Sequence, residues 1–124
     1  MLDVTVVFLD NGYASTAVAP VEIFFSAGRL TNALRGAAPE PQFRVTPVSV
    51  SGGHTQPPYP LALVPEKSIR EVRGTDLIFV ASAALDADAT IDANRAVLPW
   101  LRRWRARGAA IAGVCTGVAL LAEA

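Results

Sequence analysis

The only cysteine of this chain, Cys115, lies between two glycines in the segment Gly113-Val114-Cys115-Thr116-Gly117. The apolar run before it, residues 109–114, is typical of a buried strand, and the residues after it have helical spacing. This pattern predicts a nucleophile elbow, a sharp strand-to-helix turn that presents one side chain at its apex. Flanking glycines ease such a turn, and the positive end of the helix dipole favours a thiolate. Cys115 is therefore a candidate nucleophile.

An alternative is that the thiol is a small apolar group of the core, which is the usual role of a free cysteine. The position of Cys115 favours function, because open α/β sheets bind ligands at the carboxyl ends of their strands. His54, the only histidine, falls in a predicted loop, and we expect it to be solvated. One cysteine and one histidine form no metal-binding cluster, and no nucleotide-binding glycine motif is present, so we expect neither metal nor cofactor.

Composition narrows the class of protein. The 124 residues, 52% of them hydrophobic, suffice for one globular domain, residues 1–124. Eleven basic and eleven acidic residues cancel, so the net charge favours neither nucleic acid nor an anionic membrane as a partner. A single cysteine excludes an internal disulfide, and the chain shows neither a signal peptide nor a membrane-length apolar run. We therefore expect a cytoplasmic protein.

Strands and helices alternate along the predicted chain. The first helix is predicted to begin at an N-cap of Ser15 or Thr16 and to run to Leu34. A second helical segment over 89–107 is predicted in two pieces divided near Pro99, with Gly108 as C-cap. A third helix is predicted to begin at Val118. Strands are predicted over 3–9, 43–50, 77–80 and 109–114. This order predicts an α/β fold with a doubly wound, mostly parallel, flavodoxin-like sheet.

Three further segments carry expectations of their own. Pro47 places the second strand at an edge or a bulge, because proline cannot donate to the ladder. Residues 51–60 are predicted to form a surface excursion with a short strand pair. The arginines of the third helical segment are interpreted as a solvated face rather than a nucleic-acid site: Arg102, Arg103, Arg105 and Arg107.

The segment from Trp100 to Ala124, with the ending VCTGVALLAEA, resembles the ThiJ/PfpI superfamily, whose fold is glutamine amidotransferase-like. Together with Ala19-Pro20-Val21-Glu22-Ile23-Phe24, it is most similar to the N-terminal effector domain of a subgroup of AraC-family transcriptional regulators. The resemblance implies that the domain is incomplete after the elbow helix. It also implies that DNA binding belongs to a C-terminal domain absent from this chain.

The resemblance also assigns site residues. Catalytic members pair the cysteine with an acid four residues before the proline, where this chain has Thr16; the other recurrent acid is Glu22, expected to cap or brace the helix. A Gly-Gly pair that helps to bind an oxyanion is replaced by Ser82-Ala83. We therefore expect a ligand pocket with these residues at its wall: Cys115, Thr116, Ser82, Ala83, Thr16 and Glu22.

Three functions remain open at this point. The favoured one is a ligand-sensing or dimerising regulatory domain that binds an unknown small-molecule effector, rather than an enzyme. The first alternative is a cysteine enzyme of hydrolase, hydratase or glyoxalase type, with Cys115 as nucleophile and the Thr116 amide at the oxyanion. The second is a redox-sensing thiol. A homodimer is expected because the first helix is apolar around much of its circumference, at Ile23, Phe24 and Phe25.

Overall fold

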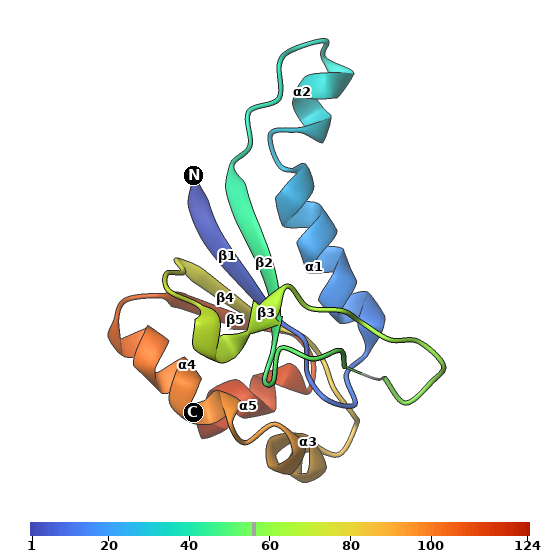
Figure 1. Ribbon diagram of the computed structural model, residues 1–124, viewed down its shortest axis with the longest axis vertical. Coiled ribbons are helices and arrows are strands. Elements are labelled where there is room, and N and C mark those ends of the chain that lie inside the picture. Colours follow the sequence, from blue (N-terminus) through green and yellow to red (C-terminus); the bar gives the residue numbers. More distant parts are fainter. Residues whose placement is uncertain (56) are drawn as a thin grey trace.

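The computed structural model describes residues 1–55 and 57–124, and within them a parallel sheet carries helices on both faces (Figure 1). The strands lie in the order β3-β2-β1-β4-β5, and every pair is parallel. The doubly wound α/β fold predicted from the sequence is confirmed. The elements are β1 (Leu2–Val7), α1 (Ala14–Ser26), α2 (Leu30–Leu34), β2 (Phe43–Ser49), β3 (Lys67–Ser68), η1 (Ile69–Glu71), β4 (Leu77–Val80), α3 (Ala87–Ala93), α4 (Val97–Ala106), β5 (Ala110–Gly113) and α5 (Gly117–Glu123).

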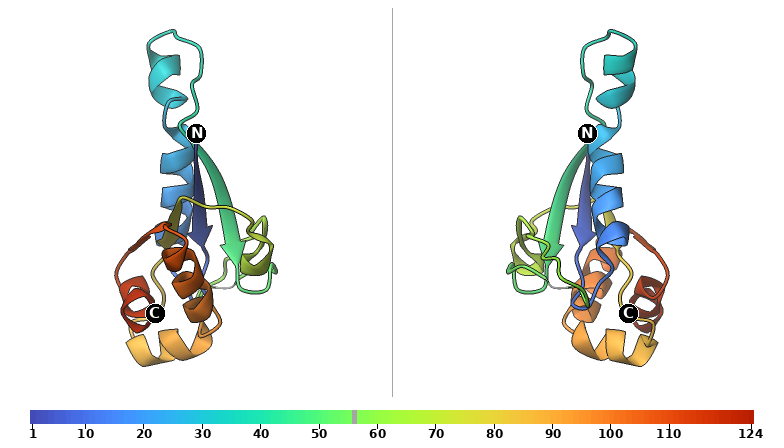
Figure 2. Two further views of the ribbon diagram at one scale, coloured as in Figure 1. Left: turned by 90° about the vertical axis from the view of Figure 1, so that its left-hand side faces the viewer. Right: turned by 90° about the vertical axis from the view of Figure 1, so that its right-hand side faces the viewer.

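The apolar run of β1 is buried on both faces of the sheet, as its composition predicts. Val4 and Val6 pack in the cluster that contains Ala17 of α1, whereas Val7 packs in the cluster that contains Leu101 of α4 and Leu120 of α5. Alternate residues of a strand point to opposite faces, so α1 covers one face and α4 and α5 cover the other. Figure 2 shows these layers from the two sides.

The first helical segment is divided, where the sequence predicted one helix to Leu34. α1 ends at Ser26, and Gly28 adopts a left-handed backbone with φ of 74°. A Cβ on Gly28 would lie 1.9 Å from the Glu40 carbonyl oxygen, and the Glu40 amide donates to the Gly28 carbonyl at 2.9 Å. The chain that leads into β2 thus forces a glycine turn here. α2 consequently stands beyond the end of the sheet at which β1 begins (Figures 1 and 2).

The second helical segment forms the two predicted pieces, but the division lies before Val97 instead of at Pro99. Pro99 occupies the first turn of α4, where its missing N–H has no helical partner to lose. The break is held by Asn94, a fully buried side chain that accepts from the Asp10 amide at 2.9 Å and donates to the Thr90 carbonyl at 3.0 Å. Gly108 follows the helix with φ of 95°, as the predicted C-cap requires.

β2 is not the outermost strand, because the two-residue β3, missed from the sequence, pairs with its last residues, Val48 and Ser49. Pro47 lies just before that pairing begins, and its carbonyl accepts from the Glu66 amide at 2.8 Å. The strand pair predicted within 51–60 is instead a single antiparallel bridge between Thr55 and Leu63; residue 56 lies outside the described residues. None of the helices in the described ranges is long and apolar enough to cross a bilayer.

Candidate functional site

The structure contains the predicted strand-to-helix turn at Cys115. β5 ends at Gly113 and α5 begins at Gly117, so the cysteine lies at the carboxyl end of an edge strand. Cys115 has a left-handed backbone with φ of 51°, which a residue with a Cβ rarely adopts, and its side chain is exposed. An exposed thiol on a constrained turn can meet a ligand, so the interpretation as a small core residue does not fit.

The flanking glycines serve close packing. A Cβ on Gly117 would lie 2.3 Å from the Ala81 carbonyl oxygen, and one on Gly113 would lie 2.8 Å from Cδ1 of Leu121. Neither glycine has a positive φ; the strained conformation is carried by Cys115 itself. Glycine at these two positions therefore lets the first turn of α5 rest against the end of β4.

The hydroxyl of Thr116 joins the elbow to the segment after β4. Its oxygen accepts a hydrogen bond from the Ala83 amide at 2.9 Å, and it donates to the Ala83 carbonyl at 3.0 Å. The Ser82 hydroxyl lies 3.2 Å away and completes the cluster. Ser82 and Ala83 are both buried, so these bonds form largely away from solvent.

Thr16 reaches the same segment from α1. Its hydroxyl accepts from the Ser82 amide at 3.0 Å and donates its own proton to the Tyr13 carbonyl at 2.8 Å. The Tyr13 amide in turn donates to the Ser82 carbonyl at 3.0 Å. The structure thus brings four of the predicted site residues, Thr16, Ser82, Ala83 and Thr116, into one hydrogen-bonded cluster next to Cys115.

This cluster uses both amides that follow β4. A catalytic oxyanion site needs backbone N–H groups aimed at the reacting oxygen, but the Ser82 amide is taken by Thr16 and the Ala83 amide by Thr116. No hydrogen bond of the Cys115 sulfur is found among residues 1–55 and 57–124. The arrangement therefore holds the elbow firmly in place and leaves only the amides on the elbow itself for an anion.

Glu22 is not brought into this cluster. It lies on the exposed side of α1, in the middle of the helix, well beyond the first turn that starts at Ala14. Glu22 therefore does not cap the helix. The N-cap predicted at Ser15 or Thr16 is also wrong, because the helix begins earlier and Tyr13 occupies the N-cap position without a side-chain cap bond.

Two side chains at the carboxyl end of the sheet were missed by sequence reasoning. The Tyr59 hydroxyl accepts from the Ala14 amide at 2.7 Å and so satisfies the start of α1 from a distant loop; its ring lies 6.2 Å from that of Tyr13. The other is Asn94, described above. Only the asparagine carried a signal, since asparagine is a poor helix former that often marks the end of a helix.

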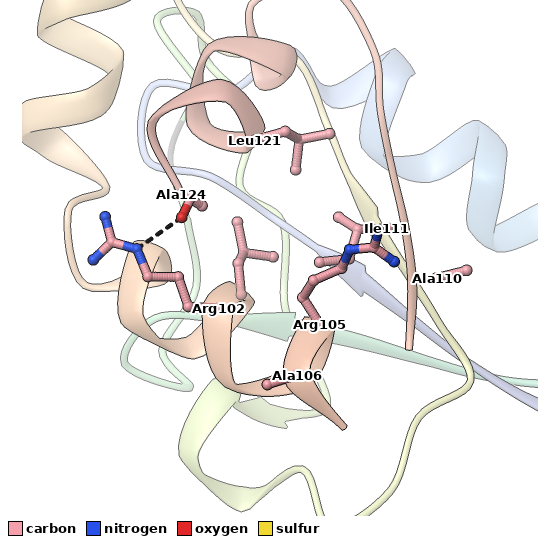
Figure 3. A pocket seen from close by; sticks show the side chains of 8 residues that line it. Arg102, Arg105, Ala106, Ala110, Ile111, Leu121 and Ala124 are labelled. Atoms are coloured by element: carbon pink, nitrogen blue, oxygen red, sulfur yellow. Dashed lines mark hydrogen bonds between the residues drawn. The ribbon is translucent and has the colours of Figure 1, made fainter. Parts of the chain in front are cut away.

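Cavities lie beside the elbow and not under it. One of about 700 Å³ is enclosed by α4, β5 and α5 (Figure 3), another of about 720 Å³ opens along residues 57–62, and a third of about 350 Å³ lies between η1 and α4. Cys115 lines none of these three. The Cys115 side chain is exposed, so a ligand can reach it from solvent. No group of three or more His, Cys, Asp or Glu side chains in the described part of the chain converges on a metal site.

Comparison with solved structures places this fold among known proteins. A protein provisionally described as a transcriptional regulator of Vibrio parahaemolyticus matches with TM-score 0.77 at 16% identity over 98% of this chain. DJ-1beta of Drosophila melanogaster matches with a TM-score of 0.76 at 16% identity, and an AraC family transcriptional regulator of Pseudomonas putida matches with a TM-score of 0.71 at 21% identity. Each match covers 98% of this chain.

The chain spans about 60% of the length of these structures: 60%, 59% and 60%, respectively. No family model matches the sequence, and no curated protein does either. Structures described as DJ-1 superfamily or DJ-1/ThiJ/PfpI-like proteins also lie among the neighbours. The chain therefore has the DJ-1/ThiJ/PfpI-type fold, which is also found in this AraC family transcriptional regulator and in the DJ-1 superfamily proteins.

Proposed function

We propose that this chain is the ligand-sensing or dimerising part of an AraC-type transcriptional regulator, not an enzyme. The observation that carries the proposal is the occupation of the Ser82 and Ala83 amides by threonine hydroxyls. A cysteine enzyme of this fold would need donors for a developing oxyanion and a base for the thiol. Here the position of the acid is taken by Thr16, whose only hydroxyl proton is directed to the Tyr13 carbonyl.

The same cluster offers a route for a signal. An effector that contacts Cys115 and competes for the Thr116 hydroxyl would disturb the Ser82 segment, to which Thr16 attaches the start of α1. Such a ligand shifts the equilibrium between two arrangements of a dimer only if it binds one of them more tightly than the other. We propose that Thr116 at the elbow and Thr16 at the start of α1 are coupled through the Ser82 segment.

Apolar side chains are exposed at the far end of α1 and on α2. Ile23 and Phe25 of α1 are 67% and 55% exposed, and Leu30 and Leu34 of α2 are 57% and 81% exposed. Apolar patches of this kind mark sites of association. We propose that this surface, formed by Ile23, Phe25, Leu30 and Leu34, joins two copies of the chain, and that DNA is bound by a separate domain of the intact regulator.

The exposure of Cys115 supports one alternative, a redox-sensing thiol, since oxidation needs access but no catalytic partner. Mild peroxide followed by mass spectrometry distinguishes it. An unmodified Cys115 rejects the alternative, and a sulfenic or sulfinic adduct at peroxide levels that spare other proteins supports it.

The regulatory proposal is tested on the protein encoded by the complete reading frame, which should continue into a pair of helix-turn-helix motifs. Alkylation of Cys115 by iodoacetamide, which places a bulky group at the elbow, should change the affinity of that protein for its operator several-fold. The Cys115→Ser variant, treated in the same way, should not respond. A reading frame without a DNA-binding domain would contradict the proposal.

A further inference from the structure

Four exposed arginines line the cavity of about 350 Å³ between η1 and α4. Arg70 and Arg73 come from η1 and the loop after it, Arg103 comes from α4, and Arg107 is the C-cap residue of that helix. The remaining lining is apolar: Ile69, Val72, Trp100 and Trp104. The sequence placed the α4 arginines on a solvated face, but it gave no indication that a second pair, more than twenty-five residues away along the chain, would face them across a cavity.

The scaffold holds the two pairs in place. Arg103 and Arg107 are four residues apart and therefore lie on one side of α4, beside Trp100 and Trp104, whose buried rings anchor the helix to the core. Opposite them, η1 is fixed by a capping box in which the Ser68 amide donates to Oε2 of Glu71 at 2.8 Å. These short, braced elements fix where the four exposed side chains leave the backbone, so both arginine pairs start from set positions at the rim of the cavity.

None of the four arginines forms a salt bridge within the described residues, although Arg73 acts electrostatically on the Glu71 carboxylate. The ion pairs among residues 1–55 and 57–124 join Arg44 to Asp3, Lys67 to Glu66 and Arg95 to Asp92, and none involves an arginine of this cavity. The nearby carboxylate of Glu71 is engaged by the Ser68 amide and hydroxyl. Positive charge gathered in a concave surface focuses its field on whatever enters.

We propose that this cavity is a binding site for a compact phosphate-bearing anion, such as a phosphate monoester or a diphosphate. Guanidinium groups bind phosphate oxygens through paired, charge-assisted hydrogen bonds, and four of them match an anion with several charges. The small volume and the overall net charge of zero favour a compact anion over a nucleic-acid backbone, which needs an extended basic surface. The site is separate from the elbow and from the function proposed for it.

The other flank of α4 provides a comparison within the same helix. Arg102 and Arg105 line the larger cavity of Figure 3, where Arg102 donates to the carbonyls of Ala124 and Glu123 at 2.8 and 3.0 Å. Those arginines face α5 and β5, not η1. Arg105 therefore carries the same charge on the same helix without facing the proposed site, which makes it a matched control.

The two tryptophans of the chain both line the proposed site, so intrinsic fluorescence reports on it directly. The guanidinium of Arg107 lies over the Trp104 ring, 5.1 Å from its centre, and an anion that draws Arg107 away should alter the emission. The experiment titrates the chain with sodium pyrophosphate at fixed ionic strength, with ³¹P NMR of the pyrophosphate as a second measurement. We expect a saturable change.

Variants distinguish a site from general charge attraction. Arg103→Gln and Arg70→Gln should each weaken pyrophosphate binding by about tenfold, as loss of one charge-assisted contact predicts, whereas Arg105→Gln should leave it within about twofold of the wild type. Equal weakening in Arg105→Gln, or no saturation in either measurement, overturns the proposal. A short DNA duplex should not displace pyrophosphate; displacement that depends on Arg103 would identify a nucleic-acid site and also overturn it.

Discussion

The Thr116 hydroxyl and the backbone of Ala83 form a reciprocal pair of hydrogen bonds, with the Ala83 amide donating at 2.9 Å and its carbonyl accepting at 3.0 Å. The Thr116 side chain, which follows β5, thereby bonds both the backbone amide and the backbone carbonyl of the buried Ala83, which follows β4. A buried donor or acceptor that loses its partner carries a full desolvation cost. This pair accounts for the fixed position of the elbow relative to β4.

The first prediction removes that hydroxyl. Thr116→Val keeps the shape of the side chain but leaves the Ala83 amide without its partner and the Ala83 carbonyl with only the 3.3 Å bond from the Ser82 hydroxyl. The free energy of unfolding should therefore fall by about 1–3 kcal/mol. Thr116→Ser keeps the hydroxyl and should lose much less. Urea unfolding of the three proteins measures the difference, and a Thr116→Val variant as stable as the wild type would refute the role of this contact.

The second prediction concerns the packing of α5 on β4. Gly117→Ala would place a methyl group 2.3 Å from the Ala81 carbonyl oxygen, against backbone that cannot move aside, and should cost at least about 2 kcal/mol. Gly74→Ala is the control, because a Cβ there meets no atom within 4 Å. If thermal and urea unfolding show equal stability for both variants, the close packing at the elbow is not as described.

The third prediction is a pH dependence from η1. Hydrogen bonds from the Ser68 amide and hydroxyl, helped by Lys67 and Arg73, lower the pKa of Glu71 below its ordinary value of 4.5. The unfolded chain then binds more protons than the folded one, so this contribution is present above that ordinary value and is lost as the pH falls through the lowered pKa.

Comparison with Glu71→Gln isolates the effect. The wild type should be more stable than the variant near neutral pH, and the difference should shrink on acidification below about pH 4. Urea unfolding of both proteins across this range makes the measurement. A difference that grows with acidification has the wrong sign for this account.

The fourth prediction addresses association through the exposed surface of α1 and α2. Phe25→Glu places a charge in the middle of the proposed contact and should convert a dimer into a monomer, as measured by sedimentation equilibrium. Leu85→Glu alters a residue that is 83% exposed but lies outside that surface, and it should remain dimeric. A wild-type monomer, or dissociation by Leu85→Glu alone, would place the interface elsewhere or remove it.

The sequence predicts the sheet well because its central strands are nearly continuous apolar runs, as in Val4 to Val7, interrupted only by Thr5, and Leu77 to Val80. It also locates the elbow, because the apolar strand pattern changes to helical spacing at the cysteine between two glycines. The features that it misses depend on partners far away along the chain. The end of α1 is set by the contact of Gly28 with Glu40, and the start of α1 is satisfied by Tyr59.

The chemistry of the site was only partly predictable for the same reason. The absence of an acid at Thr16 is visible in the letters, but the destination of its hydroxyl is not. That this hydroxyl takes the Ser82 amide, and that Thr116 takes the next amide along, follows only from the folded arrangement. The long-range pairing of hydroxyl groups with backbone amides leaves no local pattern in the sequence.

The central claim is that Cys115 lies at a sensing surface and does not turn over substrate. The most direct test incubates the wild type and Cys115→Ser with a panel of small aldehydes, amides and nitriles and measures product formation. The account predicts no turnover above the uncatalysed rate for either protein. Turnover by the wild type that Cys115→Ser abolishes would contradict it and establish a cysteine enzyme.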